Sequence, residues 1–344
     1  TQKRKLQDFQ KKLASLSFLD PACGSGNFLT ETYICLRRLE NDVLRILQQN
    51  QIALGYELTS PIQVSISQFY GIEINDFAVT VAKTALWIAE SQMMKETESI
   101  VLMHLDFLPL KTNANITEGN ALRIDWENIV PKNELSYIMG NPPFIGYSLQ
   151  TKEQKEDILS IYVDENGKPY KTAGKVDYVA GWYFKAAQLM QNTVIQTAFV
   201  STNSITQGEQ VAAVWKPLYE RFHIHIDFAH RTFIWDSEAS QKAHVHCVIV
   251  GFSTKLNTKE RVLYSSDRFQ VVDNINAYLV NAPDIFVESN KKPICDVPEM
   301  IYGNKPTDGG FLFLTPEEKA EAIKKEPDIE KYIKTNQWCN RVHK

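Results

Sequence analysis

The sequence contains no run of apolar residues that approaches the length of a membrane-spanning helix. It opens with a segment rich in Lys, Arg and Gln, which lacks the apolar core of a secretory signal peptide. Its five cysteines include no C-x-x-C pair, and their odd number argues for reduced thiols and against a zinc cluster. We therefore expect a cytoplasmic protein that has no contact with a membrane.

An excess of positive charge is also missing. The 344 residues carry a formal net charge of -4, with 37 Lys and Arg against 41 Asp and Glu. This balance gives no global signature of nucleic-acid binding, although a local basic cleft can occur on an acidic protein. The length predicts roughly two domains, and the hydrophobic content of 44% is ordinary for a globular protein.

Strand and helix patterns alternate along the chain up to about residue 220. Apolar strand candidates lie at 18–20, 69–75, around 116–121, 135–139 and 197–203, and helical patterns lie at 27–49, 77–95, 152–161, 177–190 and 210–221. This alternation predicts an α/β fold, with a Rossmann-like, doubly wound and mostly parallel sheet. The strand candidates at 223–229 and 245–252 have no clear helix between them, so we expect antiparallel pairing at this end. A change of texture after Ser253 predicts two domains, 1–255 and 256–344.

The stretch from Phe18 to Leu29 organises this fold. It reads Phe-Leu-Asp-Pro-Ala-Cys-Gly-Ser-Gly-Asn-Phe-Leu, which predicts a strand that ends at Asp20, a glycine turn and the start of a helix. Gly24 and Gly26 allow a sharp turn and a close approach to a ligand, beside the free N–H groups of the helix. Because Leu29 stands where dinucleotide-binding loops have a third glycine, the loop suits S-adenosylmethionine better, with Asp20 holding its cationic amine.

Two further polar residues follow neighbouring strands. Glu73 ends the second strand, where a carboxylate can accept hydrogen bonds from both ribose hydroxyls of a nucleoside. Ile74, the next residue, would then pack beside the adenine ring of the cofactor. Asn120 follows the third strand, where its side-chain carbonyl can accept a hydrogen bond from the adenine amino group, although a plain turn asparagine fits the pattern equally well.

The fourth strand leads into Asn141-Pro142-Pro143-Phe144. An amine on an aromatic base is a poor nucleophile, because its lone pair is delocalised into the ring. The side-chain oxygen of Asn141 and the carbonyl of Pro142 could accept both amine hydrogens and free this lone pair, while the prolines fix their geometry. Phe144 could stack on the base. The loop therefore predicts methylation of an exocyclic amine, a reaction that needs no metal.

These two motifs resemble those of the gamma-class adenine-N6 DNA methyltransferases, in which the cofactor motif precedes the catalytic one. The stretch 176–184 resembles the helix that flanks the cofactor in that class. The stretches 199–210 and 298–310 narrow the resemblance to the MmeI-like (type IIL/IIG) restriction–modification enzymes. Those enzymes are single chains with nuclease, methyltransferase and target-recognition domains.

The resemblance implies a role for each matching residue. It places catalytic positions at Asn141, Pro142, Pro143 and Phe144, and cofactor positions at Asp20, Ala22, Cys23, Gly24, Gly26, Glu73, Ile74, Asn120 and Ala121. It implies S-adenosylmethionine as cofactor and duplex DNA as substrate, with an adenine that leaves the duplex to be methylated at N6. It also implies a parent chain that carries a nuclease and the rest of the recognition domain.

Three features depart from the family pattern. No strand-borne D…E-x-K nuclease motif is present, the Tyr-Thr-Pro motif expected before the cofactor loop is missing, and Asn120 stands where many relatives have Asp. Other functions stay open at this point, namely methylation of cytosine N4, of RNA or of protein glutamine, and a non-catalytic DNA-specificity module.

Two smaller patterns lie in the last strand region. Four histidines could converge on a metal if the two late strands pair, namely His223, His225, His244 and His246. The isoleucines that alternate with the first two favour histidines on the polar face, and we expect no metal site. Phe233 and Trp235 follow the strand candidate 223–229 in an expected loop. They could help to grip an extruded base, although exposed aromatics with a packing role fit the pattern equally well.

Overall fold

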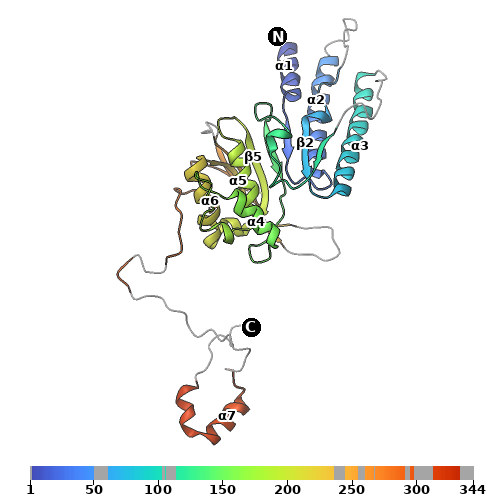
Figure 1. Ribbon diagram of the computed structural model, residues 1–344. Helices are drawn as coiled ribbons and strands as arrows, with labels where there is room; N and C mark the ends of the chain where they lie inside the picture. Colours follow the sequence, from blue (N-terminus) through green and yellow to red (C-terminus); the bar gives the residue numbers. More distant parts are fainter. Residues whose placement is uncertain are drawn as a thin grey trace. The chain divides into compact units, whose positions relative to one another are not determined.

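The computed structural model describes residues 2–49, 61–102, 105, 114–235, 245–254, 260–266, 268–290, 295–297 and 313–333. It divides the chain into two compact units, Thr1–Glu288 and Ser289–Lys344. The first unit carries the sheet and its covering helices (Figure 1). It reaches beyond the boundary expected near residue 255, and the functional division at that point stays a prediction.

Nine strands of the described residues form one sheet in the order β3-β2-β1-β4-β5-β7-β6-β8-β9. Their bounds are β1 Phe18–Asp20, β2 Phe69–Glu73, β3 Asn115–Glu118, β4 Tyr137–Gly140, β5 Gln196–Thr202, β6 His225–Trp235, β7 Val245–Ser253, β8 Arg261–Ser265 and β9 Arg268–Val272. The first five strands pair in parallel, and β7 pairs antiparallel with both β5 and β6. The mostly parallel sheet with late antiparallel pairing is therefore confirmed, although β7 lies inside the sheet.

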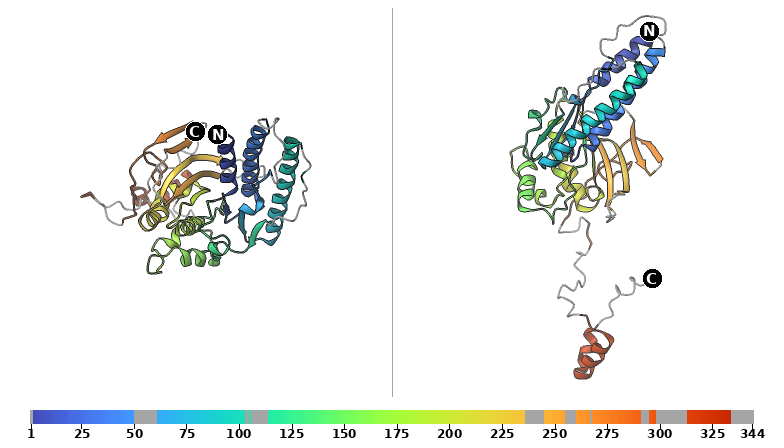
Figure 2. Two further views of the ribbon diagram at one scale, coloured as in Figure 1. Left: turned by 90° about the horizontal axis from the view of Figure 1, so that it is seen from above. Right: turned by 90° about the vertical axis from the view of Figure 1, so that its right-hand side faces the viewer.

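Helices cover both faces of the sheet (Figure 2). Their bounds are α1 Gln2–Ala14, α2 Asn27–Gln49, α3 Asp76–Val101, α4 Lys152–Ile161, α5 Ala180–Leu189 and α6 Gly208–Phe222. Because successive strand residues point to opposite faces, Phe18 packs in the cluster that includes α1, α2 and α3. Leu19, its neighbour, packs in the cluster that includes α4, α5 and α6. The bounds of α2 and α4 coincide with the helical patterns expected from the sequence.

The order of the strands reverses at β1, which has β2 on one side and β4 on the other. In open α/β sheets, ligands bind outside the carboxyl ends of the strands at such a switch point. Asp20, Glu73 and Gly140 are the last residues of β1, β2 and β4. The topology therefore brings the cofactor motif and the Asn-Pro-Pro-Phe motif to the same edge of the sheet.

The second unit contains α7, Pro316–Lys325, in its described part. Thr315 caps this helix through a reciprocal capping box with Glu318, and its proline stands in the first turn. Acidic residues in the first turn and lysines in the last turn complement the helix dipole. No helix among the described residues of either unit is long and apolar enough to cross a membrane.

Candidate active site

The loop after β1 makes the turn that its glycines predict. Gly24 and Gly26 have φ angles of +53° and +82°, which are strained for other residues. The Gly26 N–H donates to the Cys23 carbonyl at 2.8 Å, and the Cys23 N–H donates to Ile72 of β2 at 3.1 Å. A Cβ on Gly26 would lie 3.0 Å from the Cβ of Ala82. The loop is therefore packed tightly between β2 and α3.

Asp20 is almost completely buried at the end of β1. Its Oδ1 accepts a hydrogen bond from the Ala22 N–H at 3.0 Å, whereas its Oδ2 has no partner among the described residues. Burial, and to a lesser extent the charge of Glu73, raise the pKa of Asp20 to about 7, against the lowering effect of the Ala22 bond. Gly140 leaves room for this carboxyl group, since a Cβ there would lie 2.4 Å from Oδ1. The site thus holds a buried acid with an open hydrogen-bonding position.

Glu73 joins the ends of two strands. Its Oε2 accepts a hydrogen bond from the Gly24 N–H at 2.9 Å, and its Oε1 accepts one from the Asn75 N–H at 3.0 Å. A carboxylate oxygen can accept more than one hydrogen bond, so both oxygens keep capacity for a ligand. Beside it, Ile74 is 68% exposed and Phe77, in the first turn of α3, is 74% exposed. Two large apolar side chains close to the acid in the chain are therefore exposed.

Cys23 is buried, and Ala121 is held by hydrogen bonds from two side chains. Burial is the main cause that raises the pKa of the Cys23 thiol, so it is held in its neutral form. The Ala121 carbonyl accepts hydrogen bonds from the Trp126 indole and from Lys185 Nζ, both at 2.8 Å. Burial lowers the pKa of Lys185 to about 8. Lys185 thereby ties α5 to the loop after β3.

Asn120 has both of its polar side-chain atoms in hydrogen bonds. Its oxygen accepts from the Leu122 N–H and its amide nitrogen donates to Asp157 of α4, each at 2.9 Å. Asp157 is buried and also accepts from Arg123 at 2.6 Å and from the Tyr178 hydroxyl at 3.1 Å. Since Leu122 can only donate and Asp157 only accepts when ionised, the orientation of the amide is set. Its oxygen retains one lone pair for a further donor.

Asn141 follows β4 directly. Its side-chain Oδ1 is buried and has no hydrogen-bond partner among the described residues. A buried amide oxygen without a partner carries a substantial desolvation cost and needs an explanation. Asn141 and Phe144 are partly buried, Pro142 is buried and Pro143 is exposed, so the motif lies at the surface with part of it turned inward. Asn141 therefore places a hydrogen-bond acceptor without a partner among the described residues at the carboxyl edge of the sheet.

Three residues between α4 and the end of α5 connect these loops, and sequence reasoning did not assign them roles. The indole of Trp182 donates to the Pro21 carbonyl at 2.9 Å. The N–H of Tyr178 donates to the Ile145 carbonyl at 2.9 Å, beyond the Asn-Pro-Pro-Phe motif. Asp177, which is buried, accepts from the Tyr147 N–H at 3.0 Å. The motif at 176–184 marked this element, but no local pattern reveals which loop each side chain reaches.

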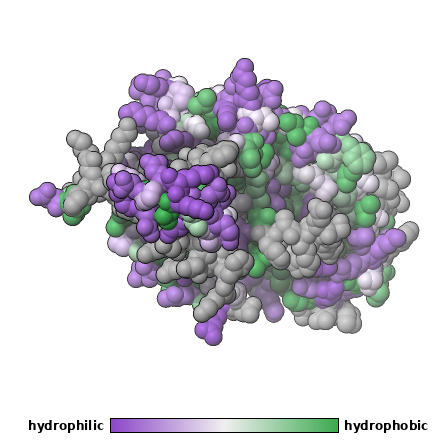
Figure 3. Space-filling model, turned by 90° about the horizontal axis from the view of Figure 1, so that it is seen from below, coloured by the Kyte–Doolittle hydropathy of each residue, from purple (hydrophilic) through white to green (hydrophobic). Residues whose placement is uncertain are grey.

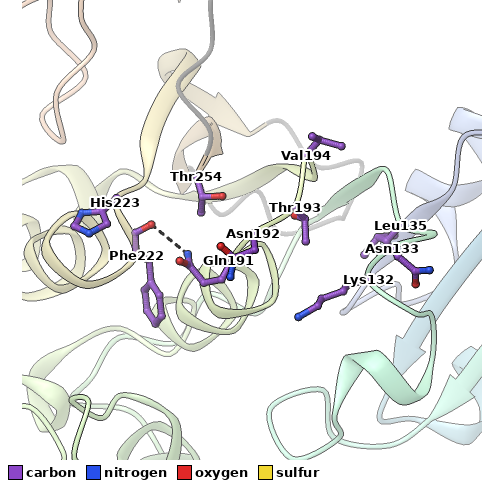
Figure 4. Close-up of a pocket in the computed structure, with 10 residues that line it drawn as sticks. All are labelled: Lys132, Asn133, Leu135, Gln191, Asn192, Thr193, Val194, Phe222, His223 and Thr254. Carbon is purple, nitrogen blue, oxygen red and sulfur yellow. Dashed lines mark hydrogen bonds between the residues drawn. The ribbon is translucent and has the colours of Figure 1, made fainter.

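Figure 3 shows the face seen from below relative to Figure 1, where apolar side chains lie among polar ones. A cavity of about 640 Å³ lies elsewhere (Figure 4), lined by Lys132, Thr193, His223 and Thr254 among others. Lys132 precedes β4, Thr193 precedes β5, and His223 precedes β6. This cavity is therefore at the amino end of the parallel strands, away from the residues described above.

Two expectations for the late strands need correction or comment. Phe233 and Trp235 lie in β6 itself, because register shifts before Phe228 and Phe233 let the strand continue past the polar residues in between. The expected loop is therefore wrong, and the Trp235 side chain lies outside the described residues.

In the β6–β7 pair His225 is opposite Ser253 and His246 is opposite Ile234, so this pairing separates the two histidines along the sheet. His244 lies outside the described residues.

The chain is similar to two known domain families and to several known proteins. Residues 1–265 match the family described as the MmeI DNA-methyltransferase domain, and residues 281–337 match the MmeI target recognition domain. The curated protein "DNA methyltransferase A" of Bacillus subtilis is 43% identical over 334 residues, 96% of this chain and 37% of that protein. A putative type II restriction enzyme and methyltransferase of Methanocaldococcus jannaschii is 28% identical over 138 residues, 40% of this chain and 11% of that protein.

Among solved structures, the type IIL restriction–modification enzyme MmeI in complex with DNA has a TM-score of 0.84 and 45% identity to this chain. The match covers 96% of this chain and 44% of that one. The chain thus spans less than half the length of these relatives. The resemblance expected from the motifs is confirmed, since the family match spans most of the chain. This chain belongs to the MmeI DNA-methyltransferase domain family.

Proposed function

We propose that this chain transfers a methyl group from S-adenosylmethionine to N6 of an adenine in duplex DNA. The buried Oδ1 of Asn141 carries this proposal, because this acceptor has no donor among the described residues and can take one from a bound molecule. An exocyclic amine of a base is such a donor. The solved relative in complex with DNA supports DNA as the source of that base.

The residues around β1 and β2 fit the cofactor. Bound there, S-adenosylmethionine would supply an electrophilic methyl group on a positively charged sulfur. Asp20 has an open oxygen for the cationic amine of the methionine end. Glu73 would accept hydrogen bonds from the ribose hydroxyls while it holds Gly24. The exposed Ile74 would cover the adenine ring, and Asn120 would accept from its amino group.

The residues after β4 would prepare the target amine. The Asn141 oxygen and the Pro142 carbonyl would each accept one amine hydrogen, which localises the nitrogen lone pair toward the methyl group. The prolines restrict the backbone, so that these acceptors are fixed before the base arrives. Phe144, which is partly buried, would stack on the ring of the base. A proton can leave the amine after transfer, so the chain needs no strong general base.

The test uses the protein in its full-length natural form, expressed in a host without adenine methylation. Host DNA is digested to nucleosides, and N6-methyladenine and N4-methylcytosine are quantified. We expect N6-methyladenine with the wild type and none with Asn141→Ala. Calorimetry should show that Asn141→Ala still binds S-adenosylmethionine, because Asp20 and Glu73 are untouched. Activity retained by this variant would contradict the role of Asn141.

Cytosine N4 methylation is the nearest alternative, since it uses an exocyclic amine in the same chemical setting. The same nucleoside digest distinguishes the two bases directly. The match of 281–337 to a target recognition domain favours a substrate with a defined DNA sequence over RNA or protein. A nuclease elsewhere in the natural protein remains part of this proposal, because both similar proteins named above as restriction enzymes combine the two activities in their names.

A further inference from the structure

The loop after the Asn-Pro-Pro-Phe motif exposes large apolar side chains beside the candidate active site. We call residues 145–150 the tip loop. Leu149 is 79% exposed and Tyr147 is 45% exposed, although the loop begins one residue after Phe144. A single exposed leucine is unremarkable on a protein surface. Its position and the rigidity of its backbone are what require an explanation.

Hydrogen bonds hold the tip loop from both ends. The Ile145 carbonyl accepts from the Tyr178 N–H, and the Leu149 N–H donates to Gly146, each at 2.9 Å. The Gln150 amide nitrogen donates to the Val176 carbonyl at 2.9 Å, and Gln150 is buried. Both ends of the loop are therefore fastened to the segment that precedes α5, and the turn at its apex is closed.

Asp177 adds a clamp in the middle of the tip loop. Its Oδ1 accepts from the Tyr147 N–H at 3.0 Å, and its Oδ2 accepts from the Ser204 hydroxyl at 2.7 Å. Its own N–H donates to Gln210 of α6 at 3.2 Å. Because a buried carboxylate with both oxygens bonded resists displacement, the tip loop is fixed relative to the turn after β5. Asp177 is thus a positioning residue for this loop.

We propose that Leu149 enters the space that the extruded adenine vacates in the DNA duplex. Extrusion leaves a gap in the base stack, and apolar side chains are suited to occupy such gaps. The clamp holds Leu149 outward before DNA arrives, so insertion does not require the loop to be ordered first. This inference rests on the proposed function, since it needs a target base that leaves the duplex next to Asn141.

The test compares two duplexes that contain the methylation site once it has been mapped in host DNA. In one duplex the target adenine is paired, and in the other it lies opposite an abasic site, which lowers the cost of extrusion. We expect Leu149→Ala to slow methylation of the paired duplex by about tenfold or more, which corresponds to the burial of one leucine side chain. On the abasic duplex the variant should approach the wild-type rate.

Three controls accompany this variant in the full-length protein. Leu149→Met keeps an apolar side chain of similar size and should retain the wild-type rate on both duplexes. Val194→Ala changes a side chain that is 70% exposed at the opposite edge of the sheet, and should also leave both rates unchanged. S-adenosylmethionine affinity, measured by calorimetry, should be the same in all variants.

A second readout follows extrusion without chemistry. With 2-aminopurine in place of the target adenine, the wild type should increase the fluorescence strongly, and Leu149→Ala should give a smaller increase. An equal loss of rate on both duplexes would overturn the proposal and point to contact of Leu149 with another part of the natural protein. No loss on either duplex would also overturn it. A wild type that methylates no adenine would remove the proposed function and this inference together.

Discussion

Asp20 gives the sharpest prediction, because its charge works against the fold and for the proposed cofactor. Its side chain is 1% exposed, and burial raises its pKa to about 7 from the ordinary value of 3.8. One oxygen accepts from the Ala22 N–H, and the other has no partner among the described residues. Asp20→Asn keeps the shape of the side chain and removes the ionisation.

The direction of the pH effect on stability depends on whether the folded or the unfolded protein binds the Asp20 proton more tightly. Between the unfolded pKa near 4 and the folded pKa near 7, the unfolded protein loses the Asp20 proton and the folded protein keeps it. The free energy of unfolding therefore falls as pH rises through this window, by about 1.4 kcal/mol per pH unit. Over roughly three units the loss is about 4 kcal/mol, and Asp20→Asn should not show it.

The assay is urea unfolding of the cofactor-free protein and of Asp20→Asn at several pH values between 4.5 and 8.5. The difference between the two free energies, rather than either value alone, isolates this carboxyl group. Calorimetry on the same samples should show that S-adenosylmethionine binds the wild type more weakly as pH falls below about 7, because the amine needs the ionised acid. Parallel pH profiles of unfolding for the two proteins would refute the reasoning.

Three further substitutions test contacts in the same site. Gly140→Ala places a methyl group 2.4 Å from Oδ1 of Asp20, so the free energy of unfolding should fall by about 1–3 kcal/mol or more. Trp182→Phe leaves the Pro21 carbonyl without its donor, and should weaken S-adenosylmethionine binding in calorimetry by several-fold while the protein stays folded. Asn120→Asp puts a second carboxyl group 2.9 Å from Asp157, so thermal stability should fall more at pH 8 than at pH 5, and Asp157→Asn should restore it.

Most of the fold could be predicted from the sequence, because its strands and helices have clear periodicity and end signals. The helix α2 begins after a glycine turn, and α4 begins at a capping box between Thr151 and Gln154. The far end of the sheet was less predictable. Polar residues around Arg231 interrupt the apolar run of β6, and only pairing with β7 shows that the strand continues through irregular register. Parallel pairing of β8 with β6 is a contact between segments distant in sequence.

The candidate site, too, could be predicted only in part from the sequence. Its short loops could be placed from motifs, because a strand end fixes where residues such as Asp20 and Asn141 emerge. The hydrogen-bonding roles of Asp157 and Asp177 could not, since each carboxylate meets partners from two or three other elements. An aspartate in a charged helix such as α4 looks like a solvated residue in the sequence. Its neighbours Lys152 and Lys155 are indeed exposed, whereas Asp157 faces inward.

The segment 177–182 resolves a difficulty that the sheet alone leaves. Strand ends bring the loops to one edge, but the proposed methyl transfer requires donor and acceptor to be aligned within a fraction of an ångström. Tyr178 bonds the tip loop through its N–H and Asp157 through its hydroxyl, so it links the Asn141 side of the site to Asn120. Its ring packs edge-on against Trp182 at 5.2 Å, and Trp182 holds the loop after β1. The segment 177–182 therefore connects the two halves of the site through hydrogen bonds and a contact between two rings.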